Sequence, residues 1–440
     1  MQNPNEQYAP YLKKLKIDSL NEMQLATIKA SQTAEDIILL SPTGTGKTLA
    51  FLLPLIANLK EIKNQVQAVI LSPTRELALQ IEEVFKKMKT PHKVTCCYGG
   101  HPMKIEKKNL VEPPAVLIAT PGRLADHMKR GNTDLSNAKT LILDEFDKSL
   151  EFGFQEDMSY IIKRLYSLDK RILTSATESI KIPKFAGVEK PIRLHFIPKK
   201  SEIKKLEINI VRSPEKDKLP TLVQLICNLE PAAMIIFCNH RESVERVSDY
   251  LYENEIFHDY FHGGLEQKER EKTLVKFRNG TYQILIATDL AARGLDIPDI
   301  KYIIHYHLPS KADAYTHRNG RTARMHARGS AYLIFHENEN IPEYITGDPP
   351  VFYLKEKPVP TAPEWETLFI GKGKKDKINK VDIVGFLAKK GALEKDEIGL
   401  IEVKDFFAYA AIKRNKIKSV LEKIKGEKIK GKKAKLEIAR

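Results

Sequence analysis

The sequence predicts an α/β protein with two tandem parallel-sheet domains, followed by a small C-terminal α+β domain. From Ile37 to Phe335, short runs that are apolar throughout alternate with amphipathic segments. Parallel strands that helices cover on both faces have this pattern. Six prolines between residues 337 and 364 then exclude long regular elements, and strand and helix patterns resume at residue 365.

The length and composition are those of a globular protein with two or three domains: 440 residues, 42% hydrophobic and 29% charged. No apolar run reaches the ~18 residues that a membrane span requires, and the first residues lack the basic and apolar regions of a signal peptide. We therefore expect a cytoplasmic protein without a membrane partner or an evident obligate protein partner. The four cysteines form no Cys-x-x-Cys pair, so we expect buried thiols.

The positive charge is concentrated at the C-terminal end. The formal net charge is +15, and residues 365–440 hold 21 Lys and Arg against 11 Asp and Glu. This bias favours a polyanionic partner such as nucleic acid, because neutralised phosphates release their counterions. A basic tail that only improves solubility is the alternative.

Candidate functional residues follow the apolar runs that we expect as strands. In the first domain these runs are residues 37–40, 68–71, 94–98, 115–119, 140–143 and 171–173, preceded by helical patterns at 11–15 and 23–30. In the second domain they are residues 206–211, 234–237, 284–287, 302–304 and 331–335. Ligands of open α/β sheets bind at the carboxyl ends of the strands, so residues that follow these runs are candidates for function.

The first candidate site is a phosphate-binding turn after the first run, with the sequence Ser41-Pro42-Thr43-Gly44-Thr45-Gly46-Lys47-Thr48. Glycines at 44 and 46 would let backbone N–H groups face a triphosphate. Lys47 would neutralise the β- and γ-phosphates, and the Thr48 hydroxyl would bind Mg²⁺. A Gly/Thr-rich surface turn without a ligand is the alternative.

A pair of acids follows the run 140–143, in the segment Asp144-Glu145-Phe146-Asp147. Adjacent acids at the end of a buried strand are costly unless a cation is present. Asp144 would hold Mg²⁺, and Glu145 would orient the water that attacks the γ-phosphate. An exposed acidic helix start is the alternative. After the next run, the hydroxyls of Ser175-Ala176-Thr177 could bond Asp147 and link the nucleotide state to movement.

Three further segments follow strand-like runs and combine hydroxyl, Arg or backbone N–H groups: Pro73-Thr74-Arg75, Gly99-Gly100 and Thr120-Pro121-Gly122-Arg123. These groups suit contacts to a sugar-phosphate backbone without reading its bases. Each segment alone could also be ordinary turn chemistry.

The second domain has no phosphate-binding turn but carries basic and hydroxyl residues. They include Arg270, the pair Thr288-Asp289, Asp296, and arginines at 318, 321 and 324. We expect these last three on one side of a helix. They could be a solvated basic face, or arginine fingers that reach the γ-phosphate and accelerate hydrolysis roughly 10³- to 10⁵-fold.

From Gln24 to Phe335 these segments resemble the DEAD-box ATP-dependent RNA helicases, with nearly every family motif in order. The resemblance implies two RecA-like domains, ATP and Mg²⁺ as cofactors, and a duplex that is locally bent when both domains close. It implies that Gln24 reads adenine, that Asp144 and Glu145 are the hydrolytic pair, and that Ser175 and Thr177 couple hydrolysis to unwinding. Asp296 would contact the ribose, and Arg321 and Arg324 would be the fingers. The implied nucleotide site comprises Gln24, Ser41, Pro42, Thr43, Gly44, Thr45, Gly46, Lys47, Thr48, Asp296, Arg321 and Arg324.

The resemblance also implies contacts to the RNA backbone from both domains. The candidates are Pro73, Thr74, Arg75, Gly99, Gly100, Thr120, Pro121, Arg123, Arg270, Thr288 and Asp289. Three places depart from the family pattern. Phe146 replaces Ala, Asn21-Glu22 replaces Pro-Thr, and Ile17 stands near an expected aromatic, which leaves adenine selectivity open.

The last domain has the order β-α-β-β-α-β, predicted at residues 368–370, 378–390, 399–403, 406–412, 414–425 and 435–438. This order resembles an RNA-recognition motif (RRM), whose two central strands carry aromatics on which bases stack. Phe369, Phe407 and Tyr409 occupy such positions, although Phe407 or Tyr409 could instead be core. Lys428, Lys430 and Lys432 would form a basic edge that holds phosphates.

We therefore predict RecA-like domains at residues 1–200 and 201–355, a linker at 356–364 and an RRM-like domain at 365–440. This arrangement resembles the bacterial DbpA group, which implies a 23S ribosomal RNA hairpin and pre-50S particles as partners. The predicted function is an ATP-dependent RNA helicase that unwinds short duplexes during assembly of the large ribosomal subunit. An ATP-switched RNA clamp without unwinding is the alternative, and the RRM-like domain disfavours a DNA helicase.

Overall fold

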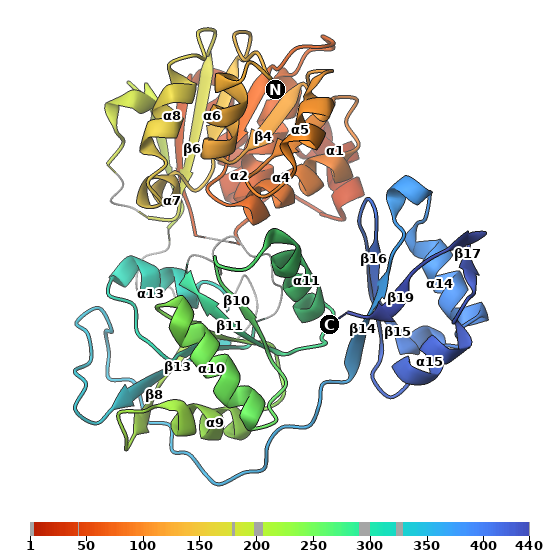
Figure 1. Cartoon of the computed structure of the whole chain (residues 1–440). Coiled ribbons are helices and arrows are strands. Elements are labelled where there is room, and N and C mark those ends of the chain that lie inside the picture. The colour runs from red at the N-terminus through yellow and green to blue at the C-terminus, as the bar shows by residue number, and fades with distance from the viewer. Residues whose placement is uncertain are drawn as a thin grey trace. The chain divides into compact units, whose positions relative to one another are not determined.

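The computed structural model describes residues 4–42, 44–177, 181–197, 206–289, 300–322 and 329–439. These residues form two compact units, one before residue 198 and one after residue 205. The first contains a parallel sheet with its helices, and the second contains another such sheet and the C-terminal domain (Figure 1). Three candidate residues, Thr43, Asp296 and Arg324, lie outside the described residues.

The first unit contains a seven-stranded parallel sheet with the strand order β3-β4-β2-β5-β6-β1-β7. Its strands are β1 (Asp36–Leu40), β2 (Ala68–Leu71), β3 (Val94–Cys97), β4 (Val116–Ala119), β5 (Thr140–Leu143), β6 (Lys170–Ser175) and β7 (Ile192–His195). Its helices are α1 (Pro4–Leu15), α2 (Glu22–Thr33), α3 (Lys47–Asn58), α4 (Arg75–Met88), α5 (Met103–Leu110), α6 (Pro121–Lys129), α7 (Phe146–Glu151) and α8 (Gln155–Ile162).

Apolar cores lie on both faces of this sheet. Ile37 packs in the core that includes α1 to α4, whereas its neighbour Ile38 packs in the core that includes α6 and α8. Successive residues of a strand point to opposite faces, so a strand between two cores is apolar throughout. All six runs predicted for this domain are therefore strands. Strand β7 was missed because it is an edge strand whose side chains are mostly exposed.

The second unit contains a six-stranded parallel sheet with the order β10-β11-β9-β12-β13-β8. Its strands are β8 (Leu206–Ser213), β9 (Met234–Cys238), β10 (Asp259–Phe261), β11 (Ile284–Thr288), β12 (Tyr302–His305) and β13 (Gly329–His336). Its described helices are α9 (Leu219–Asn228), α10 (Arg241–Glu253), α11 (Gln267–Arg278) and α13 (Ala312–Asn319). The five runs predicted for this domain are strands, and β10, which has three residues, was missed.

The C-terminal domain has the predicted β-α-β-β-α-β order. Its elements are β14 (Trp365–Ile370), α14 (Lys380–Lys389), β15 (Ile398–Val403), β16 (Ala408–Lys413), α15 (Ile417–Lys423) and β19 (Leu436–Ile438). The four strands form an antiparallel sheet in the order β15-β16-β14-β19, with β14 and β16 at its centre. A short hairpin of β17 (Lys428–Ile429) and β18 (Lys432–Lys433) was not predicted. Both helices pack on one face of the sheet.

The segment between the second sheet and the C-terminal domain runs without helix or strand from residue 352 to residue 364. Phe352 and Leu354 pack against the core of the second sheet, and Val351 pairs with Ile210. The expected buried thiols are present at Cys96, Cys97 and Cys238. Cys227 is only partly buried, since it lies near the surface end of α9, and all four cysteines are free.

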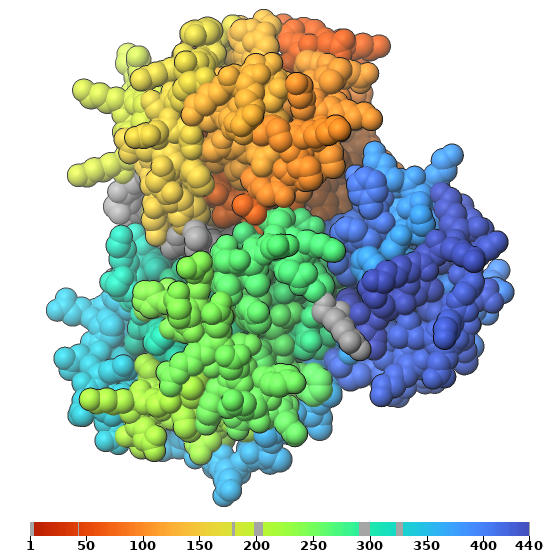
Figure 2. Space-filling model, in the orientation of Figure 1, coloured from red at the N-terminus to blue at the C-terminus, as the bar shows by residue number. Residues whose placement is uncertain are grey.

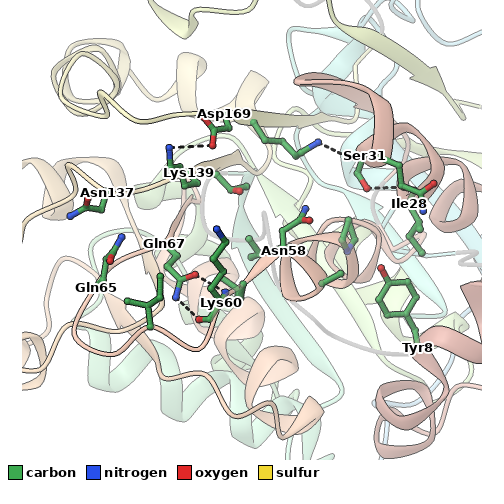
Figure 3. Close-up of a pocket in the computed structure, with 18 of the residues that line it drawn as sticks. Tyr8, Ile28, Ser31, Asn58, Lys60, Gln65, Gln67, Asn137, Lys139 and Asp169 are labelled. Carbon is green, nitrogen blue, oxygen red and sulfur yellow. Dashed lines mark hydrogen bonds and ion pairs between the residues drawn. The ribbon is translucent and has the colours of Figure 1, made fainter.

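A cavity of about 640 Å³ lies at the amino ends of strands β5 and β6 in the first unit (Figure 3). It is lined by residues that include Tyr8 of α1, Ile28 of α2, Lys139 and Lys170. The phosphate-binding turn follows the carboxyl end of β1, so this cavity lies at the opposite end of the sheet. Among the described residues, no helix is both long enough and apolar enough to span a membrane.

Candidate nucleotide and nucleic-acid sites

In the first unit, the candidate residues share the carboxyl edge of one sheet. Apart from Gln24 on α2, those assigned to the nucleotide follow β1, β5 and β6, whereas those assigned to nucleic acid follow β2, β3 and β4. The strand order β3-β4-β2-β5-β6-β1-β7 places these two sets on adjacent halves of the same edge. The paired strands β2 and β5 lie where the two halves meet.

In the candidate phosphate-binding turn, the Lys47 side chain bonds to backbone carbonyl oxygens of the turn itself. Gly44 and Gly46 have φ angles of +81° and +90°, which favour glycine. The Lys47 ammonium donates hydrogen bonds to the carbonyl oxygens of Ser41 at 2.6 Å and Pro42 at 3.0 Å. The hydroxyls of Ser41 and Thr45 are 2.8 Å apart, so Ser41 braces the turn. A phosphate that enters would exchange these carbonyl partners for its own oxygens.

Gln24 links helix α2 to this turn. Its backbone N–H donates to Asn21 Oδ1 at 2.9 Å and its Oε1 accepts from the Asn21 N–H at 3.0 Å, which forms a capping box. Gln24 Nε2 donates to the Gly46 carbonyl at 3.3 Å, and Asn21 Nδ2 donates to the Thr45 carbonyl at 3.0 Å. A Cβ on residue 46 would lie 2.6 Å from Gln24 Nε2. The unusual Asn21 thus caps the helix, and adenine reading by Gln24 stays a prediction.

Thr174 organises the acidic pair. Its hydroxyl donates to Asp144 Oδ1 at 2.7 Å and accepts from the Glu145 backbone N–H at 3.0 Å. Asp144 is 4% exposed, and burial raises the pKa of its carboxyl group despite the hydrogen bond from Thr174 and the charge of Lys47. Glu145 has a φ of +46°, a strained conformation for a residue with a side chain. Thr174 was not among the residues predicted from the sequence. Its position directly before the candidate Ser175 was the one feature of the sequence that pointed to it.

The expected hydroxyl contact to the last acid of the motif is present. Thr177 Oγ1 donates to Asp147 Oδ2 at 3.1 Å. Ser175 Oγ lies 3.1 Å from Thr177 Oγ1 and accepts from the Thr177 backbone N–H at 3.0 Å. The end of β6 is therefore tied to both ends of the acidic segment, through Thr174 and through Thr177.

Phe146, which stands where the family pattern has Ala, is a core residue of the first domain. Its side chain is fully buried in the core on the α6 and α8 face of the first sheet. Its ring meets that of Phe185 edge to face, with centroids 6.5 Å apart. The large side chain fills core space beneath the acidic pair and does not enter the nucleotide site.

The residues after β2 and β3 lie close together. Thr74 caps helix α4 by accepting the Leu77 backbone N–H at 3.3 Å. Arg75 begins that helix, and its guanidinium would lie 3.4 Å from a Cβ placed on Gly99. Gly100 has a φ of +86°. The two segments thus place an arginine beside a backbone turn, and their RNA contacts stay predictions.

Glu106 holds the arginine of the third segment, and sequence analysis missed it. Its side chain is fully buried. It accepts hydrogen bonds from Arg123 Nη1 at 2.9 Å and the Tyr98 N–H at 2.9 Å, and contacts His127 Nε2 at 2.8 Å and His101 Nδ1 at 3.1 Å. Burial raises the pKa of Glu106, but hydrogen bonds from both histidines and Tyr98, with the charge of Arg123, lower it to about 2. In the sequence, Glu106 stands out only as an acidic residue among the lysines of helix α5.

In the second unit, the expectation of three arginines on one side of a helix is wrong. Helix α13 ends at Asn319, with Gly320 after it, so Arg321 lies in the following turn. Arg318 is 2% exposed and pairs with Asp289 through two hydrogen bonds of 2.5 and 2.8 Å. Its guanidinium also lies 5.0 Å from the centroid of the Phe237 ring. Arg318 therefore braces the end of β11, where Asp289 was assigned to RNA.

The other second-unit candidates lie on α11 and β11. Arg270 is in the first turns of α11, with its guanidinium 5.0 Å from the centroid of the Phe261 ring. Thr288 is the last residue of β11 and is buried, and Arg321 is 5% exposed. These positions fix the side chains locally, and their RNA and nucleotide contacts stay predictions.

The three aromatics of the C-terminal domain gather on the sheet face opposite its helices. The ring centroids of Phe369, Phe407 and Tyr409 lie 5.5 to 5.9 Å apart. Tyr409 is only 3% exposed, because Val275 of α11 packs with it. Of the two roles left open for this residue, the core role is the one observed. Stacking of a base on Tyr409 would require this contact to open.

The basic edge is the β17–β18 hairpin. Lys430 Nζ lies 3.2 Å from Asp382 Oδ2, and Lys432 Nζ donates to the Asp376 carbonyl at 2.6 Å. Lys430 thus anchors the hairpin to α14, Lys432 anchors it to the turn before α14, and Lys428 is exposed.

Three family models match the chain. They are DEAD/DEAH box helicase at residues 21–184, Helicase conserved C-terminal domain at residues 217–326, and DbpA RNA binding domain at residues 367–438. One match lies in each parallel-sheet domain, and the third lies in the C-terminal domain.

Relatives and solved structures agree with these matches. The ATP-dependent RNA helicases DbpA of Bacillus subtilis (strain 168) and Escherichia coli (strain K12) are each 31% identical to the chain. The first match covers 92% of this chain and 91% of the relative, and the second covers 90% and 89%. The structure of Mss116p bound to ssRNA and AMP-PNP aligns with a TM-score of 0.67 at 27% identity, covering 76% of this chain and 73% of that one. Dbp5 of S. cerevisiae bound to RNA and ADP BeF3 aligns with a TM-score of 0.66 at 26% identity, covering 76% and 90%. The chain therefore belongs to the DEAD-box ATP-dependent RNA helicases, in the DbpA-like group with a C-terminal RNA-binding domain.

Proposed function

We propose that this helicase unwinds short RNA duplexes near a 23S ribosomal RNA hairpin during assembly of the large ribosomal subunit in the cytoplasm. The observation that carries the proposal is the strand order of the first sheet, which sets the nucleotide candidates and the RNA candidates on adjacent halves of one edge. We refer to them as the nucleotide half and the RNA half. The match of residues 367–438 to the DbpA RNA binding domain supports the ribosomal target.

The nucleotide half fits a triphosphate with Mg²⁺. Lys47 would bind the β- and γ-phosphates after it leaves the carbonyl oxygens of Ser41 and Pro42. Asp144 and Thr48 would hold Mg²⁺, which supplies positive charge beside the phosphates. These ligands fit this ion. Burial raises the pKa of the Asp144 carboxyl group, because a buried negative charge is unfavourable, and a nearby cation would stabilise the ionised carboxylate.

Glu145 would accept a hydrogen bond from the attacking water and orient it toward the γ-phosphate. The bond from its backbone N–H to Thr174 holds the strained backbone at this position. Arg321 and Arg324 would complete the site from the second domain, as in the family.

The RNA half would hold the sugar-phosphate backbone. Arg75 and Arg123 supply positive charge there, and Glu106 fixes the direction of the Arg123 guanidinium. Contacts to the sugar-phosphate backbone do not distinguish one base sequence from another. Selection of the RNA would therefore fall to the C-terminal domain. Its excess of lysines over acids and the exposed Lys428 suit a phosphate-rich hairpin.

A strand-displacement assay separates the helicase from an ATP-switched clamp. The substrate is a short labelled duplex beside a fragment of 23S ribosomal RNA, with and without ATP. A helicase releases the labelled strand only with ATP, whereas a clamp binds the substrate with ATP but releases no strand. DNA of the same sequence as activator tests the DNA helicase alternative.

A further inference from the structure

A cysteine, a glutamate and a histidine lie together in the first unit, outside the nucleotide site. Cys97 is the last residue of β3, Glu106 lies on α5 and His127 lies on α6. The Cys97 sulfur, a Glu106 carboxylate oxygen and a His127 ring nitrogen lie within 4.8 Å of one another. Within the part of the chain that the structure describes, no other three His, Cys, Asp or Glu side chains meet in this way. Sulfur, nitrogen and oxygen atoms of these three residue types are the protein ligands of Zn²⁺.

The three side chains are fully buried, but two of their neighbours reach the surface. Figure 1 labels α5 and α6 in the first unit, and Figure 2 shows the orange surface that this part of the chain forms. The side chains of His101 and Arg123, which both contact Glu106, are 27% and 13% exposed. An ion could therefore enter past these two residues and reach ligands that bulk water does not touch.

The contacts of His127 suit a metal ligand. Its Nε2 lies 2.8 Å from Glu106 Oε2, and its Nδ1 lies 3.2 Å from Asn132 Nδ2. In the metal-free protein the carboxylate accepts the Nε2 proton, so Nδ1 accepts from the Asn132 amide. A metal ion at Nε2 requires the proton on Nδ1, and the Asn132 amide can accept it after turning its oxygen toward the ring. A second hydrogen bond of this kind orients most histidine ligands.

Arg123 supplies the positive charge beside Glu106 in the metal-free protein. Its Nη1 lies 2.9 Å from Glu106 Oε2, the same oxygen that contacts His127 Nε2. A divalent ion bound to this oxygen would repel the guanidinium and take over one of the lone pairs that it uses. Metal binding and the Glu106–Arg123 pair therefore compete for one carboxylate.

We propose that Cys97, Glu106 and His127 form a Zn²⁺ site, and that Zn²⁺ bound there displaces Arg123 from Glu106. The three ligand atoms draw together around the ion, and a water molecule completes the tetrahedral set. On binding, the Cys97 thiol gives its proton to solvent, the His127 proton moves from Nε2 to Nδ1, and Glu106 binds as the carboxylate. Burial and the charge of Glu106 raise the pKa of the Cys97 thiol, so its proton is present in the metal-free protein.

The consequence for activity rests on the proposed function, whereas the metal site does not. Arg123 is a candidate RNA contact, and Glu106 fixes the direction of its guanidinium. Once displaced, Arg123 is no longer held in that direction, so Zn²⁺ should lower the stimulation of ATP turnover by RNA.

Co²⁺ absorption spectra of the full-length protein test the site without nucleotide or RNA. Co²⁺ occupies tetrahedral zinc sites, and a thiolate ligand gives it a charge-transfer band in the near ultraviolet. We expect this band in the unmodified protein, its removal by Zn²⁺, and its absence in Cys97→Ala. Cys96→Ala is the matched control and should keep the band, because Cys96 precedes Cys97 on β3 but packs in the core on the other face of the sheet. No band in the unmodified protein, or an equal band in Cys97→Ala, would overturn the proposal.

Removal of Arg123 tests the competition. Arg123→Ala should bind Zn²⁺ about tenfold more tightly or better, because the ion no longer displaces a charge-assisted hydrogen bond. Arg130→Ala removes the same charge from an exposed position at the end of α6 and should leave the affinity unchanged. Competition with a colorimetric zinc indicator measures both affinities. Unchanged or weaker binding in Arg123→Ala would contradict the displacement.

ATP turnover with ribosomal RNA tests the consequence for activity. With Mg²⁺ in large excess, Zn²⁺ that fills the site should lower turnover toward the RNA-free rate in the unmodified protein and in Cys96→Ala. The same Zn²⁺ concentration should leave the turnover of Cys97→Ala unchanged. Equal inhibition of the two cysteine variants would show that zinc acts elsewhere and would overturn this consequence. Absence of RNA stimulation before zinc is added would instead count against the proposed function.

Discussion

Thr174 donates a hydrogen bond of 2.7 Å to the buried carboxylate of Asp144. The same hydroxyl accepts the backbone N–H of Glu145, whose backbone is strained. One side chain at the end of β6 thus contacts both acids of the candidate nucleotide site, and its removal should affect both.

Thr174→Val removes this hydroxyl with little change in shape. It leaves the buried Asp144 carboxylate without its hydroxyl partner, a loss of about 1 to 3 kcal/mol. We expect RNA-stimulated ATP turnover to fall about tenfold or more, since each 1.4 kcal/mol of lost transition-state stabilisation is a factor of ten. Thr174→Ser keeps the hydroxyl and should keep most of the turnover. Equal rates in the Val and Ser variants would show that the hydrogen bond has no catalytic consequence.

Glu106→Gln should change how stability depends on pH. In the folded protein the pKa of Glu106 falls from 4.5 to about 2. The ionised group therefore stabilises the fold fully above pH 4.5, and this stabilisation is lost as the pH falls from 4.5 toward 2. The stability advantage of the unmodified protein over Glu106→Gln should shrink in this range by at most about 1.4 kcal/mol per pH unit. Denaturant unfolding between pH 6 and pH 3 measures it, and a constant difference would argue against an ionised Glu106.

Lys428→Ala tests the basic hairpin. Lys428 is exposed, whereas Lys430 contacts Asp382 of α14 and Lys432 contacts Asp376 in the turn before that helix. If Lys428 contacts one phosphate, the slope of log affinity against log salt should become shallower by about 0.7 to 0.9. Binding of a labelled 23S ribosomal RNA fragment at several salt concentrations measures this slope. Lys418→Ala on α15 is the matched control, and an equal effect there would indicate only a general charge effect.

Sequence patterns were sufficient for the strands that carry the nucleotide and RNA candidates, because a strand buried on both faces is apolar throughout. They failed for β7, whose edge position leaves Arg193 and its neighbours exposed. They also failed for the end of α13, where buried Arg318 pairs with Asp289 and the helix stops before Arg321. The helical spacing of the arginines suggested a longer helix than the packing allows.

The supporting residues could not be found in the sequence, because their roles depend on distant partners. Thr174 acts on residues about 30 positions away, and Glu106 binds Arg123 from another helix. Tyr409 had the spacing of a stacking residue, but Val275, in a different domain, covers it. Local periodicity indicates that a side chain lies on one face of a sheet and does not indicate what packs on that face.

The most direct test of the central claim is RNA-stimulated ATP turnover in the unmodified protein and in Glu145→Gln. Glutamine keeps the size and hydrogen bonding of the side chain but cannot act as a base. We expect strong stimulation of the unmodified protein by ribosomal RNA, and a turnover about 10²- to 10⁴-fold lower in the variant, with ATP and RNA binding retained. Turnover in Glu145→Gln equal to that of the unmodified protein, or no stimulation by RNA, would rule out Glu145 as the residue that activates water in an RNA-dependent ATPase.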